Sequence, residues 1–119
     1  FKEQKTIFRK RFLLPKANGY KIIMVSDINY IYTDQKVTYL VTNEGNNEVI
    51  GLTMDELEDE LDPIIFFRAN RQFIVHIDNV AMIKNDINGK LKLLLNQKNP
   101  DEIIVSREKA PFLKKWLDR

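Results

Sequence analysis

A chain of 119 residues is long enough for one domain with a hydrophobic core, and 44% hydrophobic with 30% charged residues is typical of an ordinary soluble globular protein. The lack of cysteine excludes disulfides and thiol chemistry, and no apolar run approaches the roughly 20 residues of a membrane span. No signal peptide is visible, and the chain starts at Phe1 without a methionine, so we expect a piece of a longer protein.

The net charge of +2 is small, but its distribution along the chain is uneven. The charged residues between Thr53 and Asp62 are all acids, and the remainder of the chain has a clear excess of lysine and arginine. Such a division can separate an acidic face from a basic one, which is a weak indication of nucleic-acid binding.

The first half of the chain predicts short strands joined by turns. We expect residues 1–6 to be the end of a linker and residues 7–119 to form the domain. Turn signals such as Ala17-Asn18-Gly19 separate the strand-like runs. These runs cover residues 7–14 (closed by Pro15), 20–25, 28–32, 37–42 and 48–50.

A short acidic helix follows, because Thr53 and Glu56 have the spacing of a capping box. Met54, Leu57 and Leu61 recur at helical spacing, so one face of this helix is predicted to be buried, and Pro63 ends it. We expect this helix to support the fold.

The stretch from Ile64 to Asp78 organises the rest of the chain. Two apolar blocks, residues 64–67 and 73–75, flank a polar centre that contains Arg68 and Arg71. Guanidinium groups are not buried without partners, so the polar centre is predicted to be an exposed loop. The two apolar blocks would hold this loop in place as a rigid hydrophobic mount. A strand–turn–strand with merely solvated arginines is the plain alternative.

The second half predicts more strands and a last helix. Strands are expected over residues 80–84, 90–95 and 102–105, with a hairpin loop at 96–101. Ser106 is placed to cap a final amphipathic helix, whose start Pro111 delays. The whole is mainly β, an arrangement of antiparallel strands with one or two short helices.

Common catalytic sites are difficult to build from these residues. His76 is the one histidine, and in a strand-like run we expect a structural or surface role for it. A zinc site lacks ligands, and the glycines do not form a phosphate-binding loop. We therefore expect neither an enzyme nor a metal or other cofactor.

What remains is a set of cations and an amide at predicted loops: Lys36, Asn70, Arg71 and Arg107. Loops of a β scaffold that carry cationic and amide side chains suit the contacts that position a protein on DNA and read its bases. Arg68, at the end of an apolar block, is expected to be structural or bound to phosphate.

The central decapeptide resembles the signature of the LytTR-type DNA-binding domains. The matching residues are Phe66-Phe67-Arg68-Ala69-Asn70-Arg71-Gln72-Phe73-Ile74-Val75, followed by Asp78. The strands near residues 28–32 and 39–41, the acidic helix and the run Val105-Ser106-Arg107 also look like this family. His76 stands where relatives often have asparagine. The resemblance covers residues 12–116.

The resemblance implies an elongated fold of small antiparallel sheets and a cytoplasmic output domain of a bacterial two-component transcriptional regulator, with a receiver domain upstream. It implies loops that enter major grooves of double-stranded DNA at paired repeats, which dimers occupy. Carried over by position, the DNA-binding residues are Lys36, Thr38, Asn70, Arg71 and Arg107.

The rival function is a protein-interaction module that docks a receiver or kinase partner through exposed β edges and the amphipathic C-terminal helix. The acidic helix and the signature are joined only through Asp62-Pro63, so we expect Leu57, Leu61, Phe66 and Phe73 to share one core.

Overall fold

The computed structural model describes residues 7–98 and 101–119, so the expected linker at 1–6 and two residues of the 96–101 loop lie outside the described residues. The described part measures 49 × 42 × 25 Å along its principal axes. Within it, no helix is long and apolar enough to cross a membrane.

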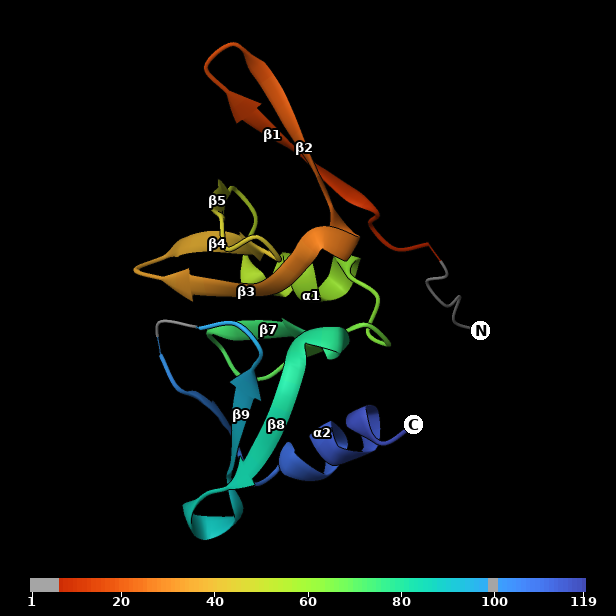
Figure 1. The fold of residues 1–119 in the computed structure, drawn as a ribbon, viewed down its shortest axis with the longest axis vertical. Coiled ribbons are helices and arrows are strands. Elements are labelled where there is room, and N and C mark those ends of the chain that lie inside the picture. Colours follow the sequence, from red (N-terminus) through yellow and green to blue (C-terminus); the bar gives the residue numbers. More distant parts are fainter. Residues whose placement is uncertain (1–6, 99–100) are drawn as a thin grey trace.

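The predicted mainly β fold is confirmed, with the strands in three antiparallel sheets (Figure 1). A two-stranded sheet projects from one end of the molecule, a five-stranded sheet in the order β5-β4-β3-β7-β6 forms the middle, and a three-stranded sheet in the order β10-β9-β8 lies at the other end. The strands are β1 Arg11–Lys16, β2 Gly19–Met24, β3 Ile28–Asp34, β4 Val37–Thr42, β5 Asn47–Ile50, β6 Phe66–Arg68, β7 Phe73–His76, β8 Val80–Asn85, β9 Leu91–Leu95 and β10 Ile103–Val105.

Two α-helices cover the sheets: α1 Met54–Glu60 and α2 Ala110–Leu117. The expected capping box is present at α1, since the Thr53 hydroxyl accepts from the backbone N–H of Glu56 and the Glu56 carboxylate accepts from that of Thr53. Ser106 closes a turn with Lys109, and α2 begins only at Ala110, immediately before Pro111. The proline therefore delays the helix as predicted.

The hydrophobic residues form two clusters, one on each face of the five-stranded sheet. Alternate residues of β7 point to opposite faces, so Ile74 joins a cluster with Leu57 of α1, while Phe73 joins one with Leu93 of β9. The expectation of one shared core was wrong for Phe73. Leu57, Leu61 and Phe66 do share a cluster, but the pleat places Phe73 on the other face.

Two smaller expectations also change. Pro15 lies within β1 and does not end it, which a strand outside a larger sheet tolerates because one edge needs no backbone donor. Thr33 and Asp34 belong to β3, so the break before β4 consists of only Gln35 and Lys36.

Candidate nucleic-acid interface

The loop between β6 and β7, residues 69–72, has its backbone fixed by side chains. The Asn70 Oδ1 accepts hydrogen bonds from the backbone N–H of Gln72 at 2.8 Å and of Phe73 at 2.9 Å. Its Nδ2 donates to the carbonyl oxygen of Ile104 in β10 at 2.9 Å. The amide of Asn70 thus shapes the loop and ties it to the neighbouring sheet.

Arg68 holds the same loop from its other side. Its Nε donates to the carbonyl oxygen of Asn70 at 2.7 Å, and an Nη nitrogen donates to that of Arg71 at 3.0 Å. These bonds fit the first of the two roles expected for Arg68, structural or bound to phosphate. Arg71 itself is exposed at the surface of this pinned loop.

The turn between β3 and β4 presents Lys36 at the same end of the five-stranded sheet. The backbone N–H of Thr33 donates to the carbonyl oxygen of Gln72 at 3.0 Å, which joins this hairpin to the β6–β7 loop. Gln35 and Lys36 have φ values of 48° and 67°, the left-handed pair that a tight two-residue hairpin requires. Lys36 is exposed.

Thr38, the next predicted contact, lies differently. It pairs with Thr33 in β3 and with Ile50 in β5, and only 6% of its surface is exposed. A base contact by its hydroxyl needs an accessible side chain. The structure gives Thr38 and Asn70 roles inside the domain, and DNA contact by either stays a prediction.

Arg107 follows β10 and has a side chain that is 71% exposed. Its Nη2 nitrogen lies 3.8 Å from the Glu108 carboxylate, in an exposed ion pair of little energetic weight. Gly89 of the β8–β9 turn has a φ of +77°, and a Cβ built there would lie 2.9 Å from the Cγ and Cδ of Arg107. The stem of Arg107 therefore rests on a position that only glycine fits without displacement.

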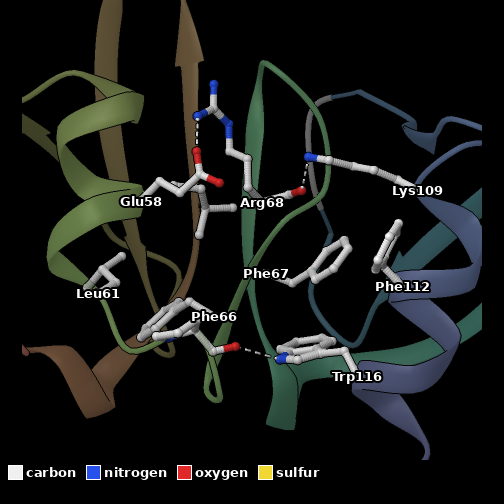
Figure 2. A pocket seen from close by; sticks show the side chains of 10 residues that line it. Glu58, Leu61, Phe66, Phe67, Arg68, Lys109, Phe112 and Trp116 are labelled. Atoms are coloured by element: carbon white, nitrogen blue, oxygen red, sulfur yellow. Dashed lines mark hydrogen bonds and ion pairs between the residues drawn. The ribbon is translucent and has the colours of Figure 1, made fainter. Parts of the chain in front are cut away.

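Two further cations near Arg71 were not predicted from the sequence. Lys90 and Lys109 line the same open hollow as Asn70 and Arg71. The Nζ of Lys109 donates to the carbonyl oxygen of Arg68 at 2.7 Å, as Figure 2 shows. The Asn-Gly pair before Lys90 is typical of a turn, and nothing in the sequence places that turn beside Arg71.

His76, at the end of the signature, faces the interior. It is 8% exposed, its Nδ1 accepts from the backbone N–H of Asp78 at 3.1 Å, and its ring meets Phe66 edge-on. Burial lowers the pKa of His76 below the usual value, so the imidazole is neutral at pH 7. This matches the structural role expected for it.

Cationic side chains on loops of an antiparallel β scaffold are typical of domains that contact DNA through loops. The model of the LytTr DNA-binding domain family matches residues 18–118 of the chain. The chain therefore belongs to the LytTr DNA-binding domain family, which confirms the resemblance of the central decapeptide.

Relatives and a solved structure agree with this assignment. The sensory transduction protein LytT of Bacillus cereus is 30% identical over 113 residues, which cover 94% of this chain and 44% of the relative. LytT of Oceanobacillus iheyensis is 28% identical over 120 residues, covering 92% and 48%. A LytTr DNA-binding domain from Bacillus cereus has the same fold, with a TM-score of 0.75 and 23% identity over 93% of this chain and 99% of that one.

The chain thus spans just under half the length of the two relatives.

Proposed function

We propose that residues 7–119 form the sequence-specific DNA-binding domain of a bacterial two-component regulator and act in the cytoplasm through DNA contacts, without catalysing a reaction. The observation that carries the proposal is the exposure of Arg71 on a loop whose backbone is held by Arg68 and Asn70. A guanidinium on a fixed backbone suits bidentate recognition of a guanine edge, because its two donors must meet O6 and N7 together.

The five predicted residues divide into three groups under this proposal. Arg71 and Arg107 are exposed and reach base edges or phosphates. Lys36 at the β3–β4 turn contributes a phosphate contact from the same end of the sheet. Asn70 and Thr38 contribute the shape of the loop and of the strand that carry these cations.

The regulatory setting is part of the proposal. The LytT relatives are described as sensory transduction proteins and are about twice as long as this chain. We propose a receiver domain upstream and dimers on paired DNA repeats. Symmetric half-sites fit this arrangement because a two-fold dimer needs two copies of its binding site.

Selection of duplexes from a randomised pool, followed by binding titrations at several salt concentrations, tests the proposal. The chain should enrich a defined sequence, and its affinity should fall steeply between about 50 and 200 mM salt as counterions are released. Arg11→Ala is the matched control, since Arg11 is an exposed arginine of the separate β1–β2 sheet. No enrichment, with equal loss of affinity in Arg11→Ala and Arg71→Ala, would favour the protein-docking function instead.

A further inference from the structure

Arg68 has the densest set of polar contacts near the proposed DNA-binding surface. Its guanidinium makes four hydrogen bonds, and its side chain is 12% exposed. Two of these bonds go to loop carbonyls, those of Asn70 and Arg71, and two go to carboxylates of α1.

The two bonds from Arg68 to the loop hold the carbonyl groups of Asn70 and Arg71. Because Nε and Nη2 belong to one rigid plane, binding both carbonyl oxygens fixes the orientation of two successive peptide units. Asn70 secures the following N–H groups of the loop. The side chain of Arg71 consequently leaves the surface from a backbone that is held on both sides.

The bonds to α1 fix the guanidinium itself. An Nη nitrogen lies 3.1 Å from the Asp55 carboxylate and 3.0 Å from the Glu58 carboxylate, and Figure 2 shows the contact with Glu58. The carbonyl of Arg68 is meanwhile held by Lys109. Charge-assisted bonds of this kind resist rotation of the side chain more than neutral bonds do.

We propose that Arg68 is a positioning residue for Arg71, and that Asp55 and Glu58 couple the acidic helix to base recognition through it. The inference rests on the proposed DNA-binding function and adds a role for α1 beyond support of the fold. A direct phosphate contact by Arg68 is disfavoured, since its donors are largely used within the domain and its side chain is mostly buried.

A double-mutant cycle between Arg68 and Arg71 tests the coupling. Arg68→Met should lower the ratio of affinities for the selected duplex and for unrelated DNA by about tenfold, because a misaligned Arg71 loses its bidentate contact. In the Arg71→Ala background the same substitution should change the ratio by less than about twofold. A loss that persists without Arg71 would overturn the proposal.

Other roles of Arg68 have different signatures. A phosphate contact would weaken both kinds of DNA and reduce the salt slope by about one. A purely stabilising role would lower the melting temperature and leave the ratio unchanged. Arg68→Lys keeps the charge without the planar fork, so it should lose discrimination as Arg68→Met does, and full recovery by lysine would also overturn the proposal.

Glu58→Gln tests the link to α1 with Arg68 in place, and it serves if Arg68→Met fails to fold. It should lower the ratio by about two- to threefold, since one of two carboxylate partners is lost. Glu44→Gln, an exposed acid of the β4–β5 turn, is the control for the change in net charge. Equal effects of the two substitutions would show that Glu58 acts only through its long-range charge. Glu58 would then have no part in positioning Arg71 through Arg68.

Hydrogen exchange on the free protein separates this inference from the function on which it rests. In Arg68→Met, the amides of Gln72 and Phe73 should exchange faster than in the wild type, because the loop is no longer pinned on its far side. Unchanged exchange would contradict the proposal that Arg68 holds the loop, whether or not the chain binds DNA. Failure of wild-type binding with faster exchange would contradict only the proposed function.

Discussion

The β6–β7 loop and the β3–β4 turn lie at one end of the same sheet and each presents a cation, but they are held in different ways. The loop that carries Arg71 is fixed by the side chains of Arg68 and Asn70. The turn that carries Lys36 consists of two residues with positive φ, and the Thr33 hydroxyl donates a hydrogen bond across it to the carbonyl oxygen of Val37 at 3.1 Å.

This difference indicates two kinds of DNA contact. A rigid guanidinium on a pinned loop can select one base edge, because its direction is set before binding. A lysine ammonium on a four-carbon stem acts as a point charge that follows the phosphates. The loop should therefore supply discrimination between sequences, and the turn should supply affinity for any duplex.

The largest effect is expected from removing the mount of the Arg71 loop. Phe73 is 0% exposed, its ring packs against Tyr30 and Tyr32, and its carbonyl oxygen accepts from Ala69 across the loop. Phe73→Ala should lower the free energy of unfolding by about 3 to 5 kcal/mol, measured by denaturant titration. A loss below about 1 kcal/mol would show that the loop does not depend on this ring.

The next effect concerns discrimination alone. Arg71→Ala should leave the circular dichroism spectrum and melting temperature unchanged, because the side chain is exposed. It should cost about 1 to 3 kcal/mol of discrimination and relax specificity at one position of the selected duplex. Equal weakening on all DNA would instead place this arginine on a phosphate and remove the contrast with Lys36.

Gly89→Ala extends the comparison to Arg107, whose support is steric. Alanine at a φ of +77° is strained, and its Cβ would collide with the stem of Arg107. We expect a loss of about 1 kcal/mol in stability together with reduced affinity for the selected duplex. Gly19→Ala is the control, because a Cβ there meets no atom within 4 Å. Equal losses of DNA affinity in the two variants would show that Gly89 does not seat Arg107.

Lys36→Gln should have a smaller effect that does not depend on sequence. Glutamine removes the charge and keeps a side chain of similar length at the same positive φ. Affinity for selected and unrelated duplexes should fall by the same factor, with the slope of log K against log salt reduced by about one. A change in the preferred sequence would mean that the turn reads bases as the loop does.

Local signals in the sequence predicted much of this structure. The spacing of Thr53 and Glu56 predicted the capping box, and the apolar blocks 64–67 and 73–75 indicated β6 and β7, although Ile64 and Ile65 lie in the turn before β6. These features depend on neighbours in the chain, so propensity and spacing suffice to find them.

The parts that sequence did not predict depend on contacts between distant residues. The pairing of Arg68 with Asp55 and Glu58 joins β6 to α1, and the bond from Asn70 to Ile104 joins two sheets. The Arg68 guanidinium and the Asn70 amide are polar groups that would suit DNA contact equally well. Only the folded structure shows that their donors are already used within the domain.

Thr38 shows the same limit in a strand. Alternation along β4 places Val37, Tyr39 and Val41 on one face and Thr38 on the other, but it does not reveal that a second layer covers the face of Thr38. Leu40, the next residue on the face of Thr38, packs in the cluster around α1. Thr38 is accordingly enclosed although it follows a loop.

The smallest effect is therefore expected from Thr38→Val, which exchanges the hydroxyl for a methyl group of nearly the same size. With 6% of the residue exposed, the substitution should leave affinity and the salt slope unchanged on selected and unrelated duplexes. Stability should change by no more than about 1 kcal/mol, because at most one hydrogen bond is exchanged for apolar contact. DNA-binding titrations of Thr38→Val and Lys36→Gln should be run together. The two residues are two positions apart, but only Lys36 is exposed. A specific loss in Thr38→Val would mean that the hairpin opens on DNA and that the β3–β4 turn is remodelled for base contact, whereas the β6–β7 loop is pinned before DNA binds.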